Sequence, residues 1–199
     1  MIHCLKFKNY WKGGERRVDY RTDPIDRIKI RKIAAAIRAI FKAKPNEPFD
    51  VIWALETISI VFPNTNYEIV PDSDSRVKGI PATIVSETNG CFQIIIKESV
   101  YEAAAFRNNG GCRMHIMHEI SHCVLFNIGY RPYFDRAYKN YELNPYESIE
   151  WQSKALAGEA LIPYEETIGM GINEICDIYK VSIDAAKKRI KLDNEYKEK

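Results

Sequence analysis

The segment that most constrains the fold is 113–126, RMHIMHEISHCVLF. In a helix, residues four apart share a face, so His118 and His122 direct their imidazoles toward one point. Two neutral imidazoles at this spacing can supply half of a tetrahedral Zn²⁺ site, with bonds of about 2.0–2.1 Å. Apolar residues at helical spacing predict that another face is buried: Ile116, Ile120 and Val124. We therefore expect a buried helix over about 112–127.

Glu119 directly follows the first of these two histidines. Its carboxylate is placed to take a proton from a water molecule at the metal, as the glutamate of the HExxH motif does in zinc peptidases. The alternative is a buried helix whose histidines only satisfy hydrogen bonds. Three of the four histidines in the chain fall within this segment, as His115, His118 and His122, and this clustering favours the metal site.

A third ligand has to come from outside this helix, because a catalytic zinc site uses three protein ligands and leaves a fourth position open. No histidine follows His122, so the sequence predicts a carboxylate from the next helix, expected over about 145–161. The candidates are Glu142, Glu147, Glu150 and Glu159. Position in the predicted helix slightly favours Glu147 or Glu150, and the residue pattern does not separate these two.

The composition is that of a globular protein, with 46% hydrophobic and 28% charged residues in a chain of 199 residues. The net charge of +2 gives no electrostatic reason to expect nucleic-acid or membrane binding. No apolar run approaches the length of a membrane span, and the first residues do not resemble a signal peptide. Five cysteines without a CxxC pair indicate reduced thiols. We expect a cytoplasmic protein without membrane contact.

Hydrophobic periodicity predicts an α+β fold. Asp23 and Pro24 have the residue types that begin a helix, which would end near Pro45, and a second helix is expected over about 49–61. Three short β-branched segments predict a small mixed or antiparallel sheet: 67–70, 80–85 and 92–97. The alternation in 92–97 predicts a half-buried edge strand, which either pairs with an extended peptide or only covers the core.

We divide the chain into three parts. Residues 1–22 form an N-terminal arm, 23–165 form the metal-binding domain and 166–199 form a small helical annex. Within the domain, a tyrosine-rich loop over 130–146 either lines a substrate cleft or packs over the sheet. The annex looks like a helix-turn-helix. Four of its residues suit packing better than base reading: Ile183, Ala185, Ala186 and Ile190.

Two segments in order resemble the ImmA/IrrE family of metallopeptidases. The first is 113–126, preceded by SVYEAA at 99–104, and the second is YESIEWQSKALAGEALIP at 146–163. In that family the second motif is similar to E-W-Q-A-N-x-F-A-G-x-L-L-M-P, and its leading glutamate is the third metal ligand. The resemblance therefore places that role on Glu150, and it covers roughly residues 28–192.

Some positions depart from the family pattern. Ser121 stands where Gly is usual, Lys154 where Asn or Asp is usual, and Leu156 where Phe is usual. Further departures precede and follow the histidines: Met114, His115 and Phe126. None of these removes a ligand or the glutamate base. Lys154 is the departure that bears on the support of the metal site.

The resemblance implies a zincin-like core and a zinc-dependent endopeptidase activity. His118, His122 and Glu150 would hold Zn²⁺, and Glu119 would act as the catalytic base. Members similar to this chain cut helix-turn-helix repressors of prophages, integrative elements or stress regulons, so the implied partner is a protein substrate of that kind. No residue is assigned to stabilise the oxyanion.

Two other readings belong to different functional classes. The chain would be either a non-hydrolysing metal-containing regulator or a toxin–antitoxin component, acting by protein or DNA binding. An inactive enzyme is disfavoured because both histidines and both glutamates of the motifs are present: His118, Glu119, His122 and Glu150. Recognition of DNA bases by the annex is disfavoured because its apolar residues suit packing better. We therefore expect no direct nucleic-acid binding.

Overall fold

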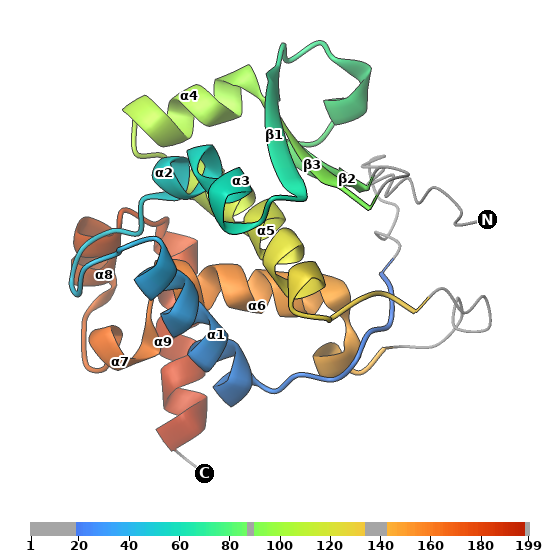
Figure 1. Ribbon diagram of the computed structural model, residues 1–199. Helices are drawn as coiled ribbons and strands as arrows, with labels where there is room; N and C mark the ends of the chain where they lie inside the picture. The colour runs from blue at the N-terminus through green and yellow to red at the C-terminus, as the bar shows by residue number, and fades with distance from the viewer. Residues whose placement is uncertain (1–18, 87–89, 134–142, 198–199) are drawn as a thin grey trace.

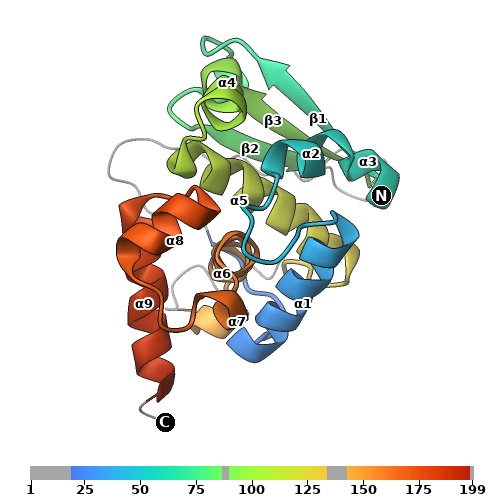
Figure 2. The same cartoon turned by 90° about the vertical axis from the view of Figure 1, so that its left-hand side faces the viewer.

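Helix α5 (Gly110–Asn127) runs through the middle of the computed structural model, with the sheet on one side and helices α1 and α6 on the other (Figures 1 and 2). The side chain of Asn109 caps its first turn, and Gly129 follows its end at a φ of 103°. Every residue from 116 to 126 is buried, which is typical of a helix enclosed on all sides. The predicted helix over 112–127 is thus confirmed, with a start two residues earlier.

The structure describes residues 19–86, 90–133 and 143–197, without the side chains of 195–197. Most of the predicted arm over 1–22 and of the predicted loop over 130–146 lies outside these residues, and the three-part division of the chain stays a prediction. The helices other than α5 are α1 (Arg27–Ile40), α2 (Val51–Glu56), α3 (Ile58–Val61), α4 (Glu98–Phe106), α6 (Ile149–Leu161), α7 (Tyr164–Thr167), α8 (Ile172–Tyr179) and α9 (Ile183–Lys197), with 3₁₀ turns η1 (Ser75–Val77) and η3 (Pro145–Glu147).

The sheet has three strands in the order β1 (Thr65–Val70), β3 (Phe92–Lys97) and β2 (Ala82–Ser86). β1 runs parallel to β3 and β2 antiparallel to it, with Ile94 opposite both Tyr67 and Ile84. The sheet is therefore mixed, and the predicted α+β class with a small sheet is confirmed.

The prediction that residues 92–97 form an edge strand is wrong, because β3 is the central strand. Ile94 and Ile96 face the main core, while Ile95 is buried on the other face in a small cluster that also contains Val77 and Ile80. The segment with η1 supplies that cover, so both faces of β3 are buried. Among the described residues, β1 and β2 form the edges of the sheet.

Three predicted helix boundaries need correction. The first helix begins after Asp26, whose carboxylate accepts a hydrogen bond from the main chain of Lys29, and not at Asp23. The helix predicted over 49–61 is interrupted at Thr57, which separates α2 from α3. The helix predicted over 145–161 begins as the 3₁₀ turn η3, and α6 itself starts at Ile149.

A buried ionic cluster joins helices that are distant in sequence. Glu159 of α6 accepts hydrogen bonds from Arg27 of α1 at 3.1 Å and from Arg189 of α9 at 2.7 Å, and Arg31 lies 3.5 Å away. Figure 2 shows α6 end-on between α1 and α9. The cluster therefore fixes both neighbours onto α6 from opposite sides.

Helices α8 and α9 meet at a short turn, where Lys180 has a φ of 52° and Ser182 caps α9 by accepting a hydrogen bond from Ala185. Three of the four residues predicted to pack do so, since Ala185, Ala186 and Ile190 lie in or against the main core, but Ile183 is exposed. None of the helices in the described part of the chain combines the length and apolar character needed to cross a bilayer.

Candidate metal centre

Three potential metal ligands meet where α5 packs on α6. The Nε2 atoms of His118 and His122 lie 3.2 Å apart. The carboxylate of Glu150 faces both, with Oε2 at 3.5 Å from Nε2 of His118 and Oε1 at 3.3 Å from Nε2 of His122. All three residues are buried. The structure thus brings together the two predicted histidines and the glutamate that the resemblance indicated.

The separations of these atoms suit a small divalent ion. A tetrahedral ion with bonds of about 2.0–2.1 Å holds neighbouring ligand atoms about 3.3–3.4 Å apart. The observed nitrogen–nitrogen separation of 3.2 Å lies within about 0.2 Å of that value, and each Nε2 has one of the two Glu150 oxygens at a similar distance, 3.5 Å for His118 and 3.3 Å for His122. Two imidazoles and one carboxylate therefore form a donor set that could hold a metal ion and leave one tetrahedral position for another ligand.

The first turn of α6 positions Glu150. Ser148 is the N-cap, and its hydroxyl accepts a hydrogen bond from the main-chain N–H of Trp151 at 2.9 Å. Asp19 accepts hydrogen bonds from the Ser148 hydroxyl and from the N–H of Glu150. The free N–H groups and the dipole of a helix start also stabilise a carboxylate placed there. Glu150 is thus a fixed anion at a helix N-terminus.

Residues 19–25 cross the start of α6 and are called the N-terminal strap below. Arg21 forms an antiparallel bridge with Ser148, and its guanidinium lies 2.6 Å from the Glu147 carboxylate. Main-chain hydrogen bonds continue the contact, from Thr22 N–H to Glu147 C=O, from Ile149 N–H to Tyr20 C=O and from Ile25 N–H to Tyr146 C=O. The strap therefore holds the element that carries Glu150.

The charge on Glu150 is set by opposing effects. Burial raises the pKa of Glu150, because a buried carboxylate loses its hydration. Hydrogen bonds and charge from His118 and His122 lower the pKa by more, so that it lies far below its ordinary value. Glu150 is therefore ionised, which is the form that binds a metal ion.

Glu119 lies in the same buried helix, with only 3% of its surface exposed. One turn later, burial raises the pKa of the Cys123 thiol well above its ordinary value, and the Glu119 carboxylate raises it further. The protonated thiol is therefore the favoured form of Cys123, and it is less reactive than the thiolate. Glu119 is the one carboxylate in α5, and it directly follows His118.

The other predicted ligand candidates are engaged elsewhere or lie outside the described residues. Glu147 pairs with Arg21, and Glu159 belongs to the ionic cluster. Glu142 is outside the described residues. His115, which was not among the ligand candidates, is exposed on α5. Only Glu150 of the four glutamates joins the histidines in the described part of the chain.

Sequence reasoning missed two residues that support the centre. The hydroxyl of Ser153 lies 2.9 Å from Nδ1 of His122, and Asp19 contacts the start of α6. Helical spacing could have found Ser153, because it lies three residues after Glu150. No local pattern points to Asp19. Lys154, noted as a departure from the family pattern, places its ammonium 3.5 Å from Oε2 of Glu150.

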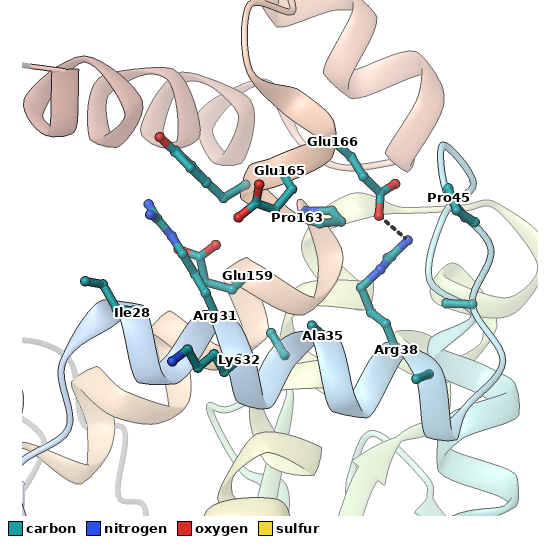
Figure 3. Close-up of a pocket in the computed structure, with 14 residues that line it drawn as sticks. Ile28, Arg31, Lys32, Ala35, Arg38, Pro45, Glu159, Pro163, Glu165 and Glu166 are labelled. Atoms are coloured by element: carbon teal, nitrogen blue, oxygen red, sulfur yellow. Dashed lines mark hydrogen bonds and ion pairs between the residues drawn. The ribbon is translucent and has the colours of Figure 1, made fainter.

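A cavity of about 520 Å³ lies between α1 and α7, away from these ligands (Figure 3). Charged side chains of both signs line it and pair with each other: Arg38 lies 3.3 Å from Glu166, and Arg31 lies 3.5 Å from Glu159. None of the three grouped ligands lines this cavity. The candidate site is therefore the His–His–Glu group.

A scan of the chain against protein-family models found no match, and a search of curated proteins found no similar sequence.

Proposed function

We propose that this chain is a zinc-dependent metalloendopeptidase that hydrolyses a peptide bond in a protein substrate. The observation that carries the proposal is the buried group of His118, His122 and Glu150, with Glu119 next to the first histidine in α5. Two histidines and a glutamate, with a further glutamate adjacent, are the components of catalytic zinc sites that split peptide bonds.

The proposal extends to the fold and the cellular setting. In it, α5, α6 and the three-stranded sheet form a zincin-like core of the ImmA/IrrE type, and α8 with α9 forms a helix-turn-helix-like annex. The protein acts in the cytoplasm, where its substrate is a helix-turn-helix transcriptional repressor cut at one site. The two motifs around residues 113–126 and 146–163 support this substrate class, through their resemblance to that family.

The chain's own residues divide the reaction between them. When bound, zinc supplies Lewis-acid polarisation of the scissile carbonyl and of the attacking water. Glu119 accepts a proton from that water as its oxygen adds to the carbonyl carbon. Glu119 then gives the proton to the amide nitrogen as the carbon–nitrogen bond breaks, which leaves a carboxylic acid and an amine. His118, His122 and Glu150 hold the centre in one geometry.

Hydrolysis is tested in cells that express either the wild-type protein or Glu119→Gln. We expect both proteins to bind one zinc ion, because the substitution keeps all three ligands. New protein N-termini are then mapped across the proteome. A new N-terminus within one helix-turn-helix protein, present with the wild type and missing with Glu119→Gln, is the expected result.

Other outcomes separate the competing functions. Wild-type protein that takes up no zinc, even when zinc is supplied, overturns the proposal. A zinc-loaded wild type that yields the same N-termini as Glu119→Gln, under conditions that induce the repressed genes, favours the non-hydrolysing regulator.

A further inference from the structure

Ser153 contacts His122, one of the three grouped ligands, on the ring nitrogen that faces away from Glu150. Its hydroxyl lies 2.9 Å from Nδ1 of His122, while the other ring nitrogen, Nε2, faces Glu150 at 3.3 Å. Ser153 is 0% exposed and His122 is 4% exposed. The two nitrogens of this ring therefore meet different partners in a buried setting.

The same helix delivers the ligand and this contact. Glu150 and Ser153 are three residues apart in α6, so their side chains share the helix face that packs on α5. Glu150 reaches the Nε2 side of His122, and Ser153 reaches its Nδ1 side. The ring is thus held between two residues of one helix.

A neutral imidazole carries one proton, and a hydrogen bond at one nitrogen selects which nitrogen keeps the lone pair. A serine hydroxyl can accept the Nδ1 proton of His122. Nε2 then keeps its lone pair and points it at the position between His118 and Glu150. Loss of the hydroxyl would leave a buried N–H without this acceptor, which carries a free-energy cost.

We infer that Ser153 is a positioning residue of the metal centre, which fixes the Nε2-ligating tautomer and the orientation of His122. This inference rests on the metal centre of the proposed function. Ser153 touches neither the metal position nor a substrate in this role, since it acts through the histidine.

Zinc affinity tests the inference without any peptidase assay. Dissociation constants are measured for the wild type, Ser153→Ala and Ser121→Ala by competition with a chromophoric chelator. Ser121 is the matched control, because it is also a fully buried serine but donates to the main-chain carbonyl of Met117 at 2.7 Å. We expect Ser153→Ala to bind zinc about 10- to 100-fold more weakly, and Ser121→Ala to bind like the wild type.

The tautomer is measured on the wild type, so the test does not depend on the folding of a variant. Long-range ¹⁵N–¹H correlation spectra of the zinc-loaded protein should show His122 protonated at Nδ1, with a proton that exchanges slowly with water. Protonation of His122 at Nε2 overturns the inference, as does a Ser153→Ala affinity equal to that of the wild type. In either case the proposed function survives, whereas a wild type that binds no zinc overturns both.

Discussion

Glu150 and Glu147 are three residues apart and have different partners. Glu150 faces the two histidines, and Glu147 pairs with Arg21 at 2.6 Å. We expect Glu150→Ala to lose bound metal and Glu147→Ala to retain it, because only the first substitution removes a donor atom. Elemental analysis of protein purified with supplied zinc measures this. Equal metal content in the two variants would contradict the assignment of the third ligand.

Lys154 competes with a cation for the same carboxylate. Its ammonium lies 3.5 Å from Oε2 of Glu150, and its side chain is 52% exposed. An exposed ion pair is worth up to about 1 kcal/mol, so we expect Lys154→Gln to tighten zinc binding by up to about fivefold. Lys154→Arg keeps the charge and should bind like the wild type. Weaker binding by Lys154→Gln would indicate that the ammonium supports the centre.

At the residue scale, the sequence predicted the part of the centre that lies within one helix. The spacing of His118 and His122 is local, and so is the adjacency of Glu119. The choice of Glu150 over Glu147 needed the family resemblance, because both glutamates are near the start of the same predicted helix. The role of Asp19 could not be predicted from local patterns, since 131 positions of sequence separate it from Glu150.

At the scale of elements, Gly110 is where α5 touches the turn between α8 and α9. A Cβ at this position would lie 2.5 Å from the main-chain nitrogen of Ser182 and 2.5 Å from the carbonyl carbon of Val181. We expect Gly110→Ala to lower the free energy of unfolding by about 1–3 kcal/mol, since backbone atoms would have to move. Urea denaturation followed by circular dichroism measures the change.

At Gly158, replacement by alanine should stabilise the protein instead of destabilising it. It lies inside α6, and a Cβ there would meet nothing within 4 Å. We expect Gly158→Ala to raise the free energy of unfolding by about 0.5–1 kcal/mol, because alanine favours the helix. A loss of stability in both variants would show that α6, like α5, has no room for a methyl group.

The elements themselves were predicted unevenly. α5 was predictable because its apolar and histidine spacing is set within one helix. The position of β3 was not, because strand alternation does not reveal what covers the second face. Here the segment with η1 buries Ile95 against Val77. In the sheet β1 pairs directly with β3, although β2 lies between these two strands in the sequence. The first helix starts later than predicted because Asp26, and not Asp23, caps its first turn.

At the scale of the whole molecule, Glu159 connects α6, which carries it, with α1 and α9. It is 2% exposed and takes hydrogen bonds from arginines of α1 and α9. We expect Glu159→Gln to lower the free energy of unfolding by about 3–5 kcal/mol, because the arginine charges would stay buried without their counter-ion. Thermal and urea unfolding measure this loss.

The control is an ion pair on the surface. Glu47 lies 3.4 Å from Lys44, and both side chains are more than half exposed. Glu47→Gln should leave the unfolding midpoint nearly unchanged, since exposed pairs are screened by water. A stability of Glu159→Gln close to that of Glu47→Gln would show that the buried cluster does not hold α1 and α9 in place.

A ribosome makes Asp19 long before it makes Glu150, whose main-chain N–H this aspartate contacts in the finished protein. Once His122 has been added and before Glu150 follows, the nascent chain carries both histidines but neither Glu150 nor a helix on which the N-terminal strap can dock. The growing polypeptide thus holds only two of the three grouped ligands until α6 has left the exit tunnel. The three-ligand group is consequently completed only after most of the chain has been translated.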